Sequence, residues 1–358
     1  MKKIAWILFI SYVSVFVVLG LVFYWKYLAK FLASGAEGQE IVTKTSLGYI
    51  YYGQDNNLYR ANPGLVDGIG ADERVERFQS TGEVSFVDIN KTGQQIAYDA
   101  WGSLGFWDIW QVDSQSSISE TVATAGQIDL KDYSDFRRPK FSPEGTQLAF
   151  IGGRDGEETI FVKNLANGKI SELLVAAGLK ITDYTWTRDG EKIIYCTDSE
   201  SLLGCWEQEL FKGGAKRIIA DETLEISADK TEEIIYLAKR EDNINIFSYE
   251  SKTGHTEAIT DVISPREVVL FQIDAQGENI VFEVATANLK NIYLAKINGE
   301  NLLQLTTDGH SQQPLFSPRC DEIAFLRVND GIYIIQTDKT KEKKIANLRS
   351  FVKLLLWR

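Results

Sequence analysis

Few residues in this sequence could carry out chemistry. It has only two histidines, His255 and His310, and neither lies in a metal-ligand pattern such as His-Glu-x-x-His. A Gly-x-Ser-x-Gly elbow for a nucleophilic serine and a glycine-rich phosphate-binding loop are also missing. Acidic residues are numerous, but the Asp-Gly and Glu-Gly pairs are typical of turns, and no carboxylate pair for glycoside hydrolysis stands out. We therefore expect no catalytic residue, no cofactor and no bound metal ion.

The three cysteines, Cys196, Cys205 and Cys320, are too few for a disulfide scaffold and lack the paired spacing of a zinc site. Packed or free thiols are the simplest interpretation. Cys196 and Cys205 flank a predicted hairpin, however, and could form a disulfide across it in an oxidising compartment. Cys320 would then stay free.

One basic pair, Arg137-Arg138, stands out because arginine can bind carboxylates through two parallel hydrogen bonds. The pair lies in an acidic body: four of the 38 basic residues precede residue 36, which leaves 34 basic and 50 acidic residues, a net charge of −16. Such a body repels phosphate backbones and anionic lipid headgroups, so we expect no nucleic-acid partner. The alternative is that both arginines are solvated and merely offset Asp132 and Asp135.

A repeat predicts the elements that position these residues. Its clearest copy covers residues 141–150, and the pattern returns at 186–195, more loosely at 316–325, and weakly at 89–98 and 273–282. Each copy has an apolar residue, a polar turn that usually contains glycine, and an apolar triplet rich in β-branched and aromatic residues. This pattern predicts a tight β-hairpin, whose aromatic residues we expect in the core.

Two independent markers count the same number of units. The apolar residue before each turn occurs at seven positions, Ile89, Phe141, Trp186, Ile226, Ile273, Phe316 and Trp357. A pair that would begin the third strand also occurs seven times, around Leu58, Ile109, Ile160, Trp206, Ile246, Ile292 and Ile332. Intervals of 40 to 52 residues between the first markers are typical of four-stranded propeller blades. We predict an all-β, seven-bladed β-propeller, with six or eight blades as alternatives.

The phase of the markers predicts how the ring closes. The third-strand marker at Leu58 comes before every first-strand marker, whereas the last first-strand marker, Trp357, ends the chain. We therefore expect residues 351–357 to form the innermost strand of a blade whose other strands come from residues 48–80. The propeller would span residues 47–358 and have no open edge.

The N-terminal segment predicts a membrane anchor. Ile4 to Trp25 is uncharged and would extend roughly 33 Å as a helix, which matches a bilayer. We expect residues 1–33 to form a cytoplasmic tip and a single transmembrane signal-anchor helix, and residues 34–46 a linker. A cleaved signal peptide is the alternative, although its apolar part is usually shorter. A short basic N-terminus that stays in the cytoplasm places the propeller outside it, in the periplasm or extracellular space.

The repeat units resemble the WD-like repeats of TolB-type propellers and of the N-terminal propellers of dipeptidyl-peptidase-IV-like enzymes. The resemblance rests on Pro139–Gly145 and on Leu305-Thr306 followed by residues 314–318, and at the level of the repeat it covers about residues 47–358. It implies architecture more than activity. TolB carries an α/β domain before a six-bladed propeller, and the peptidases carry a hydrolase domain after theirs. We expect neither domain in this chain.

In a propeller, the loops that lead into the innermost strands surround one mouth of the central channel. Counting back from the first-strand markers places eight polar residues at this mouth: Asp135, Arg137, Arg138, Asp183, His310, Gln312, Gln313 and Lys353. We predict that they bind a protein or peptide partner and that the chain is a non-catalytic scaffold. The alternatives are a propeller enzyme that acts on glycan or peptide, and a propeller that binds a small ligand or Ca²⁺ in its channel.

Overall fold

The computed structural model describes residues 48–64, 75–80, 82–115, 118–130, 132–173, 178–228, 230–348 and 352–358. Residues 47–358 form one compact unit. The predicted anchor helix and linker, residues 1–46, lie outside the described residues. In the described part of the chain, no helix is both long and apolar enough to cross a membrane.

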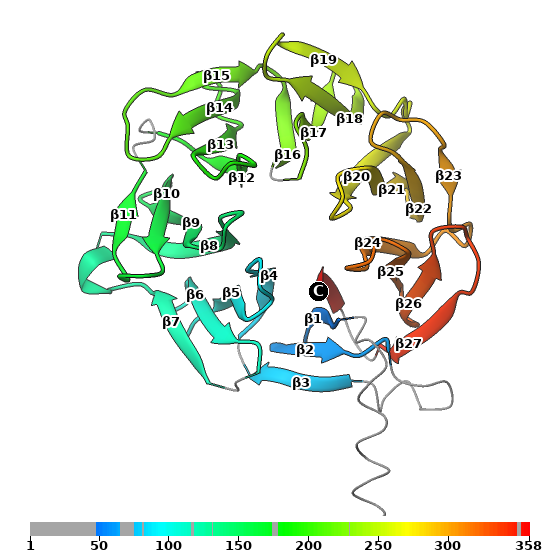
Figure 1. The fold of residues 1–358 in the computed structure, drawn as a ribbon, viewed down its shortest axis with the longest axis horizontal. Helices are drawn as coiled ribbons and strands as arrows, with labels where there is room; N and C mark the ends of the chain where they lie inside the picture. Colours follow the sequence, from blue (N-terminus) through cyan, green and yellow to red (C-terminus); the bar gives the residue numbers. More distant parts are fainter. Residues whose placement is uncertain are drawn as a thin grey trace, which may run out of the picture. The chain divides into compact units, whose positions relative to one another are not determined.

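The described strands form seven antiparallel sheets of four strands each, arranged as a ring (Figure 1). The prediction of an all-β, seven-bladed propeller is therefore confirmed, and the alternatives of six and eight blades are wrong. Blade one contains β28 (Val352–Trp357), β1 (Ile50–Gln54), β2 (Asn57–Ala61) and β3 (Val75–Ser80).

The other blades use strands that are consecutive in the sequence. Blade two contains β4 (Val84–Ile89), β5 (Gln95–Trp101), β6 (Trp107–Asp113) and β7 (Ser119–Ala123). Blade three contains β8 (Ser134–Phe141), β9 (Gln147–Arg154), β10 (Glu157–Asn164) and β11 (Ile170–Glu172). Blade four contains β12 (Ile181–Trp186), β13 (Lys192–Thr197), β14 (Gly204–Glu209) and β15 (Lys216–Ile219). Blade five contains β16 (Glu222–Ser227), β17 (Ile234–Arg240), β18 (Asn243–Glu250) and β19 (His255–Ala258). Blade six contains β20 (Arg266–Ile273), β21 (Asn279–Thr286), β22 (Leu289–Lys296) and β23 (Leu303–Gln304). Blade seven contains β24 (Ser311–Phe316), β25 (Glu322–Arg327), β26 (Gly331–Gln336) and β27 (Lys343–Asn347).

Local hydrogen bonds form the turn between the first two strands of a blade. In blade three, the amide of Gly145 donates to the carbonyl of Ser142 at 2.7 Å, and the Ser142 hydroxyl accepts from the amide of Gln147 at 3.1 Å. Gly145 has a φ of +70°, which glycine adopts without steric cost. In blade seven the same turn position is Cys320, with a φ of +62°. The turn therefore forms there at the expense of a side chain in a left-handed conformation.

Aromatic residues fill the space between neighbouring blades, as the repeat predicts. The third residue of each apolar triplet is a buried tyrosine or phenylalanine, for example Phe150 and Phe282. Phe150 stacks on Phe161 with ring centroids 5.7 Å apart, and Phe282 stacks on Tyr293 at the same distance. These rings belong to the core because the adjacent sheets exclude water from them.

The C-terminal strand closes the ring. β28 pairs antiparallel with β1, from Ile50 opposite Trp357 to Gln54 opposite Val352. Val352, Leu354 and Trp357 are buried in the cluster between blades one and seven. Lys353 lies at the mouth end of β28, whereas Trp357 lies at the other end, beside the start of β1. The chain therefore enters the propeller at the face opposite the mouth.

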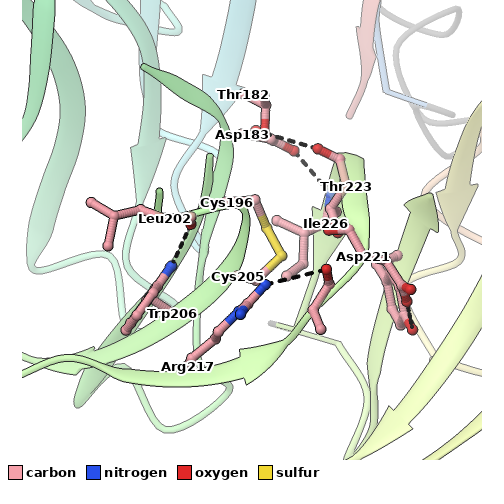
Figure 2. The surroundings of a disulfide bond; sticks show 12 residues. Thr182, Asp183, Cys196, Leu202, Cys205, Trp206, Arg217, Asp221, Thr223 and Ile226 are labelled. Atoms are coloured by element: carbon pink, nitrogen blue, oxygen red, sulfur yellow. Dashed lines mark hydrogen bonds between the residues drawn. A yellow bond between two sulfur atoms is a disulfide. The ribbon is translucent and has the colours of Figure 1, made fainter. Parts of the chain in front are cut away.

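A disulfide joins Cys196 on β13 to Cys205 on β14, which lie directly opposite each other with Cα atoms 4.0 Å apart (Figure 2). The interpretation of these two cysteines as packed or free thiols is wrong, because the two strands place the side chains on the same face of the sheet. Cys320 is free. The bond ties the second and third strands of blade four together.

Candidate functional site: the channel and its mouth

The seven innermost strands surround a central cavity of about 740 Å³. Each of β4, β8, β12, β16, β20, β24 and β28 contributes side chains to its lining. The pairing of the innermost strand with the second strand shifts register in every blade, for example between Val84 and Phe86 near the mouth in blade two. These bulges turn polar side chains toward the channel that a regular alternation would direct elsewhere.

The structure brings five of the eight predicted residues into the cavity lining: Arg137, Arg138, Asp183, Gln313 and Lys353. The other three are near the mouth but not in the lining. Asp135 forms an ion pair with Arg137 at 3.1 Å, and Gln312 is half-buried on β24. His310 is exposed just before β24, where its amide donates to the Asp308 carboxylate.

Asp183 is buried at the centre of a charged cluster on the cavity wall. Its carboxylate accepts from the Arg138 guanidinium and the Lys140 amine, both at 2.9 Å, and from the amide of Ile226 in the next blade at 3.1 Å. Figure 2 shows Asp183 directed toward the strand that carries Ile226. Burial alone would raise the pKa of Asp183, but the charges of Lys140 and Arg138 outweigh it and hold the pKa below its usual value. Asp183 therefore stays ionised.

Glu225, on β16 in the next blade, has a pKa shifted in the opposite direction. It faces the same cavity and accepts a hydrogen bond from the amide of Phe271 at 3.3 Å. Burial, and then the negative charge of Asp183, raise the pKa of Glu225 to about 7. Neither Glu225 nor Lys140 was predicted from the sequence. Each is a charged residue directly before the apolar marker of its innermost strand, Phe141 or Ile226, and that signal could have found them.

Several lining residues connect one blade to the next. The side chains of Asp88, Gln272 and Gln313 accept from the amides of Phe141, Phe316 and Leu354 at 2.7, 2.6 and 2.8 Å. Each acceptor lies on an innermost strand, and each donor lies on the innermost strand that follows. Gln313 is therefore a structural residue as well as a lining residue, because its amide oxygen is occupied.

Asp99 and Arg138 hold one of the bulges in place. The buried Asp99 carboxylate accepts from the amide of Arg138 at 2.9 Å, from the amide of Phe86 at 2.7 Å and from the Ser85 hydroxyl. Arg138 has a φ of +54°, so its backbone conformation costs free energy that these hydrogen bonds offset. This backbone conformation directs the Arg138 side chain to Asp183.

Lys353 differs from the other lining cations. Among the described residues, no hydrogen bond or ion pair to its amine is present. Its side chain is accessible from the cavity, yet the channel walls surround it. Burial lowers the pKa of Lys353; the Asp99 charge opposes this, and the Arg138 charge adds to it.

An exposed aromatic turn borders the mouth. The turn between β5 and β6 carries Trp101, Leu104 and Phe106, whose exposed fractions are 48, 66 and 41%. It lies on the mouth side because the end of β5 pairs with the start of β4. Trp107 lines the cavity and contacts Trp101 edge to face, with centroids 5.6 Å apart. The repeat predicts aromatic residues in the core, so this exposed turn was not predicted from the sequence.

The described residues contain no group of three or more histidine, cysteine or acidic side chains that could hold a metal ion. The lining side chains that the structure describes can form ion pairs, hydrogen bonds and apolar contacts.

Comparisons with known proteins agree with this architecture. No family model matches the chain. Dipeptidyl-peptidase 5 of Porphyromonas gingivalis is 27% identical over 181 residues, which cover 47% of this chain and 26% of that protein. A TolB homolog of Chlorobium luteolum is 30% identical over 107 residues, 30% of this chain and 22% of that protein. The match thus spans about a quarter of each relative.

The resemblance to TolB-type and dipeptidyl-peptidase-like propellers is confirmed. Among solved structures, oligogalacturonate lyase from Vibrio parahaemolyticus has a TM-score of 0.62 at 13% identity, and the similarity covers 82% of this chain and 88% of that chain. At this identity the similarity shows the fold alone. The propeller fold positions the channel residues, and the function depends on those residues.

Proposed function

We propose that this chain is a membrane-anchored, extracytoplasmic scaffold that binds a protein or peptide partner at its channel mouth and has no catalytic role. The observation that carries the proposal is the convergence of charged residues from five blades on one cavity bordered by exposed Trp101 and Phe106. Exposed aromatic side chains beside arginine and other polar groups are typical of the residues that dominate protein interfaces.

Three features support the proposed location and orientation. The uncharged segment Ile4 to Trp25 has the length and the flanking lysines of an anchor. The Cys196–Cys205 disulfide fits an oxidising compartment such as the periplasm or extracellular space. The start of β1 lies beside Trp357, at the face opposite the mouth, so the residues before β1 join the propeller at that face.

Affinity capture from membrane extracts tests this proposal. The full chain is solubilised in mild detergent and carries its tag at the N-terminus, because the C-terminal strand lies inside the ring. We expect the double variant Trp101→Ala, Phe106→Ala to lose the captured partner. The matched control is Phe211→Ala, Leu302→Ala, which removes exposed apolar side chains from turns at the opposite face. Capture that survives the first change and fails with the second would place the binding surface on the opposite face.

A second candidate function is cleavage of a glycan or peptide in the channel. The observation in its favour is the pair of Asp183 and Glu225, because one carboxyl is held ionised and the other has a pKa of about 7 in the same cavity. Carboxyl pairs with separated pKa values are typical of acid–base catalysis. The test is product release from oligogalacturonate or from a set of peptides, with Glu225→Gln as the inactive control. Equal rates for the wild type and this variant would exclude the pair as catalytic.

A further inference from the structure

The charge of the cavity lining is opposite to that of the propeller. The lining contains five cationic residues, Arg137, Arg138, Lys140, Lys230 and Lys353, and three acidic residues, Asp88, Asp183 and Glu225. The chain beyond residue 35 has a net charge of −16. A cationic cavity in an acidic protein concentrates field lines and attracts anions to the channel.

Most of these cations already have partners. Arg137 pairs with Asp135 and Glu158, and the Lys230 amine donates to the carbonyl of Ile273 at 3.2 Å. Arg138 and Lys140 share the single carboxylate of Asp183. The Arg138 side chain remains 38% exposed, so part of its fork of donors is open to a ligand.

Lys353 is a second cation that could bind a ligand in the cavity. Among the lining residues that the structure describes, its amine is the cation without a hydrogen bond or ion pair. Its neighbours Val352 and Leu354 are buried, so the strand holds the amine in the channel. Arg138 on β8 and Lys353 on β28 both line the cavity, and their strands both contact β4. A carboxylate between them would satisfy both.

We propose that the channel binds an acidic peptide segment of the partner protein, with a carboxylate held by the Lys353 amine and the Arg138 guanidinium. This inference rests on the proposed function and specifies the chemistry of the partner. Each contact would be a charge-assisted hydrogen bond away from bulk water, where such bonds are strong.

The rim of the channel favours a peptide over an acidic sugar. Leu104 and Leu224 are exposed aliphatic residues beside the mouth, and Leu224 also lines the cavity. Aliphatic side chains of a peptide can pack on these leucines and on Trp101, whereas a sugar acid would leave its hydroxyl groups unpaired against the leucines. The ligand is therefore an acidic segment with apolar residues beside its carboxylates.

Fluorescence anisotropy tests the proposal with the full chain in mild detergent. The probes are three fluorescein-labelled peptides of alternating leucine and a second residue, which is glutamate, glutamine or lysine. We expect the glutamate peptide to bind at least about tenfold more tightly than the glutamine peptide. The difference in affinity from the lysine peptide should be larger still. The affinity for the glutamate peptide should fall as the salt concentration rises. Lys353→Met should weaken binding of the glutamate peptide by about tenfold to hundredfold, whereas Lys353→Arg should retain it. Lys252→Met, at an exposed loop in blade five, is the matched control and should bind as the wild type does.

The outcomes separate this inference from the proposed function. Equal affinity for the glutamate and glutamine peptides, unchanged affinity in a folded Lys353→Met variant, or no binding of the glutamate peptide up to about 1 mM would overturn the acidic ligand. If affinity capture of a partner still succeeds in those cases, the proposed scaffold function is supported and only the acidic nature of the ligand is wrong. Displacement of the peptide by oligogalacturonate at a lower concentration than by unlabelled peptide would overturn the commitment to a peptide.

Discussion

Glu225→Gln should make the stability of the propeller less dependent on pH. The folded protein raises the pKa of Glu225 from 4.5 to about 7, because burial and the neighbouring Asp183 favour its neutral form. The neutral form stabilises the folded state fully below about pH 4.5, and this contribution is lost as pH rises through 7. At 1.36 kcal/mol for each tenfold change in proton affinity, the whole loss is about 3 kcal/mol, of which about 2.5 kcal/mol falls between pH 5 and pH 8.

Urea unfolding of wild type and variant at pH 5 and pH 8 measures this effect. Glutamine has a similar shape but no titration, so the free energy of unfolding of Glu225→Gln relative to the wild type should increase by about 2.5 kcal/mol between these pH values. Glu222→Gln, at an exposed position on the same strand, is the control and should show little change. A relative stability of Glu225→Gln that stays constant within about 0.5 kcal/mol would refute the reasoning.

Three further substitutions test other parts of the structure. Arg138→Ala should lower the free energy of unfolding in a urea titration by about 1 to 3 kcal/mol, because buried Asp183 loses one of its two cationic partners. The control, Arg188→Ala, removes an exposed ion pair and should lower the same quantity by less than about 1 kcal/mol. Cys320→Gly should raise the melting temperature, with a gain in stability of up to about 1 kcal/mol, because glycine adopts a φ of +62° without strain; a lower melting temperature would show that the cysteine side chain stabilises the turn. Trp357→Ala should cost about 3 to 5 kcal/mol because it empties the cluster between blades one and seven, and a loss below about 1 kcal/mol would contradict the closure by β28.

The blades were predictable because each one is encoded locally. A turn around Gly145 followed by a triplet that ends in Phe150 specifies a hairpin without help from distant residues, and this unit recurs around the ring. Counting such units therefore identified the propeller. The divergent turn at Cys320 still folds in the same way, since the flanking strands are held by their neighbours.

The channel was predictable only in part. Counting back along each blade placed Arg138 and Lys353 at the mouth, but it could not show that Asp183 is buried between two cations. Bulges break the alternation of the innermost strands, so sequence position does not determine which side chains face the cavity. The exposed position of Trp101 could not be predicted for another reason. Aromatic residues also fill the core, so residue type alone does not distinguish an exposed aromatic side chain from a buried one.

The closure of blade one links folding to the order in which the strands are synthesised. The innermost strand of the first blade, β28, follows the strands of blades two to seven in the sequence, so the ribosome makes it after all of them. Until Val352–Trp357 emerges, β1 lacks its partner and the ring stays open. A translation product that stops before Val352 therefore cannot form the closed channel and does not present Lys353 to a ligand.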